Sequence, residues 1–169
     1  MPKMSIFFIV FISIFYIVGF VILASGLNSL NQANAAKHWP TTSGIMEDVQ
    51  FITDNDSDGT TYEVRAKYLY RVQGVSYEGD NISFGYNAGS GLVAHQQIYE
   101  KLKSAKKIEV RFNPDQPSQS TLAYGATRSH FIMLTFGATW LLFVIGFTIL
   151  VFMFGQTDAG LLSRLIVLE

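Results

Sequence analysis

The chain has 169 residues, of which 12 are Lys or Arg and 13 are Asp or Glu, and it contains no cysteine. Without cysteine it has no disulfide, no thiolate metal site and no cysteine nucleophile. The near-neutral charge argues against a nucleic-acid-binding surface, which needs an excess of basic residues.

Two long uncharged stretches bracket the chain. Residues 4–36 and 129–157 contain no Lys, Arg, Asp or Glu. A helix needs about 20 mostly apolar residues to cross the hydrocarbon core of a bilayer, and residues 6–27 and 131–154 meet that need. We therefore predict two transmembrane helices.

The first stretch has a second interpretation, which is a cleaved signal peptide. Lys3 supplies a basic start, and Ala33-Asn34-Ala35 resembles a cleavage site. The apolar core of a signal peptide, however, is about 7–15 residues long, which is shorter than the apolar run here. We therefore favour a signal anchor that stays attached to the chain.

Between the two stretches the pattern changes to an alternation of apolar and polar residues. Residues 62–72 alternate in this way, which is typical of a half-buried strand with one solvent-exposed face. Residues 91–103 carry apolar side chains at helical spacing, with Ser90 as a candidate N-cap. Further strands are expected at residues 45–52, at 75–84 with an interruption near Gly79-Asp80, at 108–112 and at 120–123.

These elements predict an α+β membrane protein, in which two transmembrane helices flank a small antiparallel β-rich domain with one helix. Tight turns between successive strands favour antiparallel pairing. Near the end of the chain, Leu161, Leu162, Leu165 and Ile166 share one helical face, which predicts a surface-lying segment. The predicted parts are the signal anchor helix (1–30), the β-rich domain (37–128), the second transmembrane helix (129–155) and a short amphipathic cytoplasmic tail (156–169).

An acidic run within the domain resembles half of a calcium loop. Asp54, Asp56 and Asp58 stand at alternate positions before Gly59, as in the first part of an EF-hand. The twelfth position of such a loop is a bidentate Glu, but here it is Arg65. Because Asp, Asn and Gly are also the usual residues of a hairpin turn, we favour a turn and keep weak calcium binding as the alternative.

Two segments flank the predicted helix of the domain. The glycine-rich residues 85–91 lack the Lys of a phosphate-binding loop, so we expect a flexible connection, with anion binding at the helix N-terminus as the alternative. Basic residues at the other end complement the helix dipole, and contact with anionic lipid headgroups is the alternative. These basic residues are Lys101, Lys103, Lys106 and Lys107.

Four residues are expected at the membrane boundaries, namely His38, Trp39, Pro40 and Arg128. A Trp ring with its polar N–H suits the interface, and Pro40 prevents continuation of the first helix. His38, His95 and His130 show no metal-ligand spacing. We predict no catalytic residue, no metal site beyond the weak calcium candidate and no cofactor.

Three motifs of the domain together point to a family. It opens with His38-Trp39-Pro40-Thr41-Thr42-Ser43-Gly44, continues with Tyr68-Leu69-Tyr70-Arg71-Val72, Gly74 and Tyr77, and closes with Ile108-Glu109-Val110-Arg111-Phe112-Asn113-Pro114-Asp115-Gln116-Pro117-Ser118 and Ser120-Thr121-Leu122. With these motifs the chain resembles the domain of unknown function family 3592 of bacterial membrane proteins, over roughly residues 37–124 and the flanking helices. Such proteins often carry a Tyr-Pro-x-Gly-like turn before the last strand, where this chain has residues 103–107 instead.

The resemblance implies a multi-pass protein of the bacterial cytoplasmic (inner) membrane and brings no catalytic residue with it. The positive-inside rule counts Lys and Arg close to the ends of the spans. Lys3, Lys37, Arg128 and Arg164 give nearly a tie under this rule. We expect both termini in the cytoplasm and the middle domain outside it.

The functional prediction is a non-enzymatic binding or accessory module displayed at the bilayer surface. An exposed strand edge of its domain could accept a strand from a partner. The expected partners are the lipid bilayer and a second protein or another copy of the chain, and no nucleic acid. The alternatives are a subunit of a membrane enzyme or channel complex, and an immunity-type protein.

Overall fold

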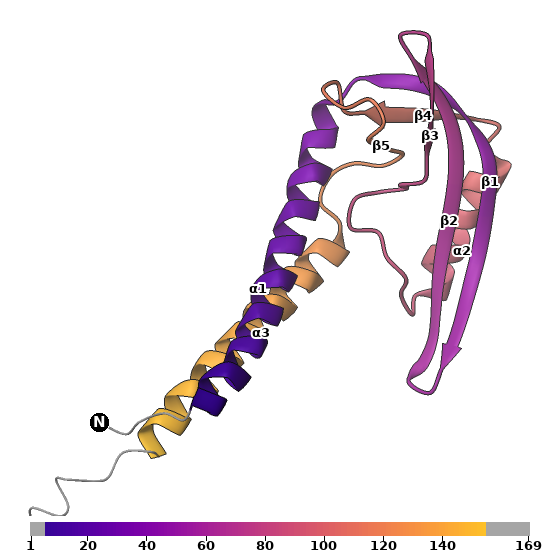
Figure 1. Cartoon of the computed structure of the whole chain (residues 1–169). Helices are drawn as coiled ribbons and strands as arrows, with labels where there is room; N and C mark the ends of the chain where they lie inside the picture. The colour runs from indigo at the N-terminus through magenta and orange to yellow at the C-terminus, as the bar shows by residue number, and fades with distance from the viewer. Residues whose placement is uncertain (1–5, 155–169) are drawn as a thin grey trace, which may run out of the picture. The chain divides into compact units, whose positions relative to one another are not determined.

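The computed structural model describes residues 6–154, which fall into two compact units. The helix unit comprises residues up to Ser25 together with those from Met133 onward, and the sheet unit comprises Gly26–Ile132. Figure 1 draws the elements of both. The predicted amphipathic tail (156–169) lies outside the described residues.

The helix unit pairs the long helices α1 (Ile6–Ala35) and α3 (Arg128–Phe154). Both helices are long and apolar enough to cross a membrane. Glycines allow the close approach of the two helices, because a Cβ at Gly19 would collide with Leu141, and one at Gly137 would lie 2.9 Å from Leu23 Cδ2.

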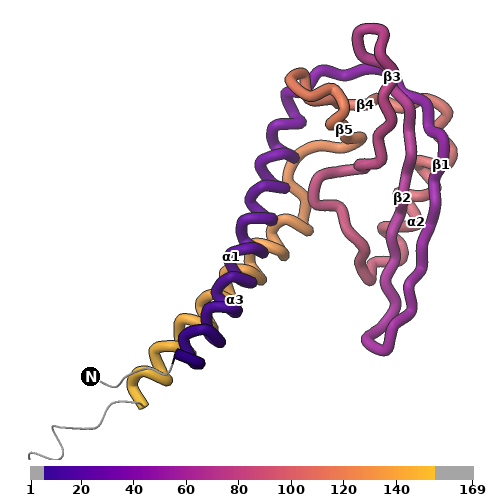
Figure 2. The backbone as a smooth tube through the Cα atoms, viewed as in Figure 1, coloured from indigo at the N-terminus to yellow at the C-terminus, as the bar shows by residue number. Residues whose placement is uncertain are grey.

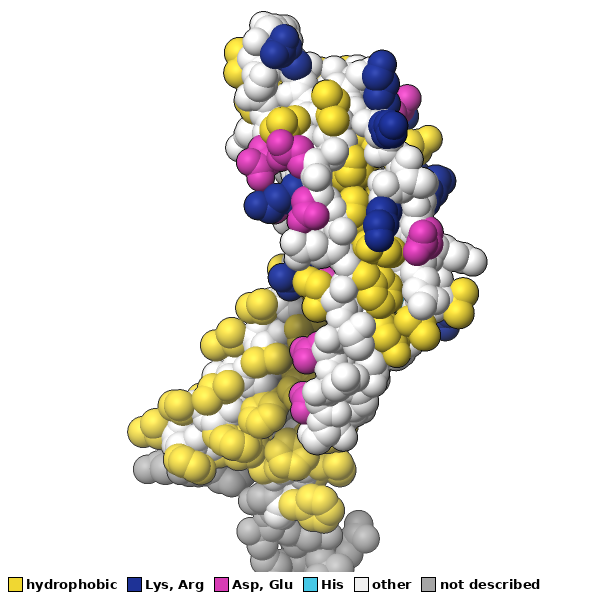
Figure 3. Space-filling view, turned by 90° about the vertical axis from the view of Figure 1, so that its right-hand side faces the viewer, with side chains coloured by type: hydrophobic (Ala, Val, Ile, Leu, Met, Phe, Trp, Pro, Cys, Tyr) yellow, Lys and Arg dark blue, Asp and Glu magenta, His cyan; other side chains and the backbone are white. Residues whose placement is uncertain are grey.

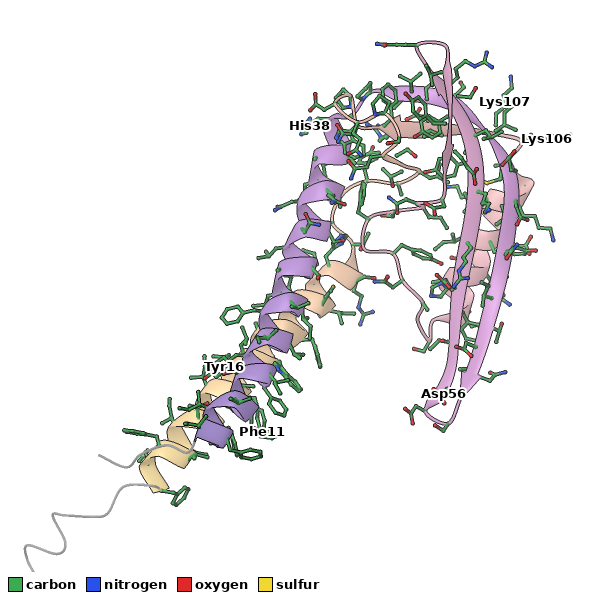
Figure 4. The ribbon with its side chains drawn as sticks, in the orientation of Figure 1. Phe11, Tyr16, His38, Asp56, Lys106 and Lys107 are labelled. Atoms are coloured by element: carbon green, nitrogen blue, oxygen red, sulfur yellow. The ribbon has the colours of Figure 1, made fainter. Side chains whose placement is uncertain are left out.

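Several polar side chains of the two helices make hydrogen bonds within the helix unit. Ser13 Oγ donates to the carbonyl oxygen of Ile9 at 2.6 Å, and Tyr16 and Thr148 share a hydrogen bond of 3.2 Å between the helices. Figure 4 labels Tyr16 on α1. Trp140 Nε1 donates to the carbonyl oxygen of Phe15 at 3.0 Å. Such bonds satisfy polar atoms where no water is at hand.

A cysteine pair tests this packing in a chain that has no cysteine of its own. A Cβ at Gly137 would lie 3.1 Å from Ile22 Cγ2, so Ile22→Cys with Gly137→Cys brings two Cβ atoms to roughly the 3.5–4.5 Å of a disulfide. We expect rapid intramolecular cross-linking by mild oxidant, seen as a mobility shift on a non-reducing gel. Phe20→Cys with Gly137→Cys is the control, because Phe20 is exposed, and equal cross-linking of both pairs would contradict the packing.

Helix α1 extends further than its apolar sequence. The prediction ended the first helical part at residue 30, but α1 continues to Ala35 and passes into the 3-10 turn η1 (Ala36–His38). The reason is packing within the sheet unit, where Ala33 and Ala36 are fully buried and Ala33 O accepts a hydrogen bond of 2.8 Å from Gly125 N. The end of α1 is therefore part of the folded domain.

The sheet has five antiparallel strands in the order β3-β2-β1-β4-β5, which confirms the predicted α+β class. Figure 2 follows its backbone. The strands are β1 (Thr41–Asp56), β2 (Gly59–Val72), β3 (Val75–Gly79), β4 (Lys107–Phe112) and β5 (Ser120–Thr121). Strand β1 is much longer than the predicted 45–52, because β4 pairs with its first part while β2 pairs with it from Gly44 to Asp56.

Two adjoining clusters form the core of the sheet unit. The first contains Tyr68, Tyr70 and Val110, and the second places Val64 and Ala66 of β2 against side chains of α2 (Leu92–Ser104). The alternation predicted for β2 is confirmed, because its residues from Val64 to Val72 are alternately buried and exposed.

Two local predictions in this region are wrong. Residues 82–84 are not a strand, because Ile82 O instead accepts hydrogen bonds from Ala123 N at 2.8 Å and Thr121 Oγ1 at 3.2 Å. Ser90 is not the N-cap of α2. Gly91 takes that position, without a side-chain hydrogen bond.

Candidate functional site

The outer edge of β1 is the candidate functional site. Strand β4 pairs with β1 only from Thr41 to Ile45. Beyond that point, within the part of the chain that the structure describes, residues 46–56 of β1 have a neighbouring strand on the β2 side alone. We call residues 46–56 the open edge.

The hydrogen bonds of β2 reveal which backbone groups face outward at the open edge. Tyr62 exchanges two hydrogen bonds with Gly89, at 2.8 and 3.0 Å, so its N–H and C=O point away from β1. Its register partner Thr53 must then point its own N–H and C=O away from β2. Because hydrogen-bonded and non-hydrogen-bonded pairs alternate, the same holds for Val49, Phe51 and Asn55.

The opposite side of the hairpin is closed by the chain itself. The bridge between Tyr62 and Gly89 covers the edge of β2, and Val64 N donates to the hydroxyl of Tyr86 at 3.1 Å. The same hydroxyl lies 2.7 Å from His95 Nδ1 of α2. The glycine-rich segment 85–91 thus covers the edge of β2, and it leads into α2.

The open edge is acidic. Residues 46–56 include Glu47, Asp48, Asp54 and Asp56 and no basic residue. In Figure 3 the charged side chains nearest the lower end of the hairpin are acidic, while Lys and Arg gather higher on the same face. The carboxylates therefore give the edge a negative charge that a partner could recognise.

The calcium candidate lies at the tip of this hairpin. Asp54 and Asp56 belong to β1, and Asp58 lies in the two-residue turn before Gly59. Asp56 Oδ1 accepts hydrogen bonds from Ser57 N and Oγ at 2.5 and 3.1 Å. Among residues 6–154 no three acidic or His side chains form a metal-binding group. The segment is the favoured hairpin turn, and weak calcium binding stays a prediction.

The four lysines of the predicted lipid contact lie around the end of α2 and the start of β4, and all are exposed. Lys103 Nζ donates to the Tyr99 hydroxyl at 2.8 Å, and this hydrogen bond raises the pKa of Lys103. Figure 4 shows Lys106 and Lys107 at the same end of the sheet unit as His38, opposite Asp56. Contact with lipid headgroups stays a prediction.

The residues predicted at the membrane boundaries take part in the fold of the sheet unit. The ring of Trp39 meets that of Phe84 edge-on at 5.7 Å between centroids, and Pro40 follows directly. His38 ends η1, and Arg128 begins α3. Their role at a lipid interface stays a prediction.

Arg111 of β4 binds the turn η1 that follows α1, and it was not singled out from the sequence. Its Nη1 donates to the carbonyl oxygens of Ala36, Lys37 and Trp39 at 3.5, 3.1 and 3.2 Å. Its guanidinium also lies 4.1 Å from the ring centroid of Tyr124. A helix end leaves carbonyl oxygens without partners inside the helix, so one side chain joins that end to the sheet.

Burial also affects the protonation of the tyrosine hydroxyls in the sheet unit. Burial raises the pKa of Tyr68, whose hydroxyl lies 2.9 Å from Asn81 O and 3.0 Å from Ser120 Oγ. Burial likewise raises the pKa of Tyr70 and of Tyr86. All three hydroxyls therefore stay protonated at neutral pH.

His130 and His95 are buried and lie apart in the fold. His130 Nδ1 accepts a hydrogen bond of 3.0 Å from Thr127 N, so the neutral ring carries its proton on Nε2. His95 Nδ1 is held by Tyr86. Nδ1 of each ring is therefore already hydrogen-bonded within the sheet unit.

Comparison with known proteins gives one family. The model of a family described as "Domain of unknown function (DUF3592)" matches residues 42–127. No curated protein and no solved structure matches the chain. The matched region covers the sheet from the second residue of β1 to β5, together with α2. On this match, which spans half of its length, the chain belongs to the DUF3592 family.

Proposed function

We propose that the protein is a non-enzymatic, membrane-anchored module that binds a partner protein along the open edge of β1. The observation that carries the proposal is the contrast between the two sides of the hairpin. The β2 side is covered by the bridge between Tyr62 and Gly89, whereas residues 46–56 of β1 leave backbone donors and acceptors without a partner strand among residues 6–154. An unpaired edge is a template for a strand from another protein.

The proposed location is a bacterial cytoplasmic membrane, with both termini in the cytoplasm and the sheet unit outside. Two helices long and apolar enough to span a bilayer support the membrane part of this proposal. Protease added to sealed cells should cut the sheet unit in exposed segments such as the turn at Ser57 and Asp58. Full protection of the sheet unit would reverse the proposed orientation.

Proline substitution at the open edge tests the binding proposal. Thr53→Pro removes one outward N–H and no hydrogen bond between β1 and β2, so the hairpin tolerates it as edge strands do. We expect recovery of a stoichiometric partner from mild detergent to fall about tenfold, since a lost hydrogen bond weakens binding by roughly 1 kcal/mol and the ring adds a steric barrier. Quantitative mass spectrometry of the purified complex measures how much of the partner is recovered.

Thr53→Ala is the matched control, because it shortens the same side chain and keeps the N–H. It should retain the partner. Both variants should unfold within a few degrees of the wild-type midpoint, about the effect of a mild surface substitution. If Thr53→Pro folds and retains its partner in full, binding by strand addition at this edge is ruled out.

A further inference from the structure

Resting on this proposed function, we propose that the partner strand is a basic extended segment of a different protein, not a second copy of this chain. Strand addition places each side chain of the new strand beside a side chain of the edge strand on the same face of the sheet. The side chains of β1 therefore specify which charges the new strand can carry.

The carboxylates of the open edge are not neutralised within the sheet. Lys67 stands opposite Asp48 in the register, but its ammonium pairs with Glu78 of β3 at 3.7 Å. Arg65, the next basic residue on this face, pairs with Glu63 at 2.8 Å. Within residues 6–154 none of the salt bridges includes a carboxylate of β1.

The spacing of the acidic residues gives a pattern for the partner. Asp48, Asp54 and Asp56 lie at even steps along the strand, so they share the face that also carries Gln50 and Ile52. A strand paired with residues 48–56 therefore meets carboxylates near both of its ends and an apolar side chain at its middle. Basic residues near both ends and an apolar residue between them complement this face.

The same pattern opposes pairing between two copies of this edge. In an antiparallel pair centred on Phe51, Asp48 of each copy stands opposite Asp54 of the other. In a pair centred on Ile52, Asp48 stands opposite Asp56. Like charges directly opposite each other destabilise a strand pair, so both of these registers are disfavoured, whereas a basic strand is favoured in each of them.

A pair of synthetic peptides tests this inference on the full chain in mild detergent. The basic peptide has nine residues, with lysine at positions one, three, seven and nine, valine at five and threonine elsewhere, so that it reads the same in both directions. Its acidic twin has glutamate in place of lysine. Fluorescence anisotropy should show that the basic peptide binds at least about tenfold more tightly than the acidic peptide. This difference in affinity should decrease as salt is added.

Charge reversal provides the decisive variant. Asp48→Lys with Asp54→Lys should reverse the preference in favour of the acidic peptide. The control Asp80→Lys with Asp115→Lys changes the net charge equally at exposed positions outside β1, and it should keep the preference for the basic peptide. Thr53→Pro should weaken binding of the basic peptide.

The remaining outcomes separate this inference from the proposed function. Equal binding of the two peptides, or an equal effect of the control pair, would overturn the choice of a basic strand. A dimer in solution that Thr53→Pro dissociates would identify a second copy as the occupant. If charge reversal leaves recovery of the cellular partner intact while Thr53→Pro abolishes it, the proposed function stands and the charge inference fails.

Discussion

Replacing Arg111 with Ala should lower the unfolding midpoint of the sheet unit by about 10–20 °C, which corresponds to roughly 2–4 kcal/mol. The side chain is only 17 % exposed and donates to the carbonyl oxygens of Ala36 and Lys37 in η1 and of Trp39, which follows it. Its removal leaves those oxygens without that donor and also removes the cation from the ring of Tyr124. Thermal unfolding in mild detergent, followed by near-ultraviolet circular dichroism, measures the shift.

Two further variants show whether geometry or charge is responsible. Arg111→Lys keeps the charge but loses the planar fork of donors, so we expect about half of the loss. Arg71→Ala removes an exposed arginine of β2, whose side chain makes no hydrogen bond or ion pair within residues 6–154, and should change stability by less than about 0.5 kcal/mol. Equal midpoints for the Arg111 and Arg71 variants would contradict the role given to Arg111.

Replacing Gly79 with Ala should destabilise the same unit by roughly 2–3 kcal/mol. A Cβ at this position would collide with the ring of Tyr68 and would lie 2.6 Å from Ser120 Oγ. Tyr68 is fully buried, and β3 can pair beside it only because residue 79 has no side chain. Chemical unfolding of the full chain in detergent, read through its circular dichroism, gives the free energy.

A second substitution distinguishes this collision from a general intolerance of change in β3. Tyr68→Leu removes the ring atoms that a Cβ would meet, so Gly79→Ala should cost less in that background than in the wild type. Gly91→Ala serves as the control glycine, because the nearest atom to its Cβ is 3.9 Å away and its φ is −79°. An additive double mutant would show that the ring is not the cause.

Local sequence patterns predicted the elements whose side chains alternate or recur within one segment. Strand β2 was expected from Tyr62 onward, because its apolar residues repeat every second position, and the core contains those residues. Helix α2 was expected at residues 91–103 and occurs at Leu92–Ser104. Both patterns report burial directly, so they are visible without knowledge of the rest of the chain.

The features that define the candidate site depend on contacts between distant segments. The open edge exists because β4 pairs with β1 only as far as Ile45 while β1 continues to Asp56, and no local pattern reveals how far a neighbouring strand extends. The contact of Arg111 with Lys37 crosses 74 positions in sequence. Residues 82–84 look like a strand, but Ile82 is bound by the segment around Thr121 instead. The sequence pattern alone places Asp54 and Asp56 in a turn or a calcium loop, because it does not reveal which strands lie beside them.

The closed side of the hairpin limits what the protein can build. Because Tyr62 and Gly89 are joined, the long hairpin has a single free side in the described part of the chain, so a strand that adds there cannot be matched by another on the opposite side. Such a hairpin can accept one partner strand. Complexes formed through it should therefore have a fixed stoichiometry of one strand per chain and should stop growing, rather than extend into fibres.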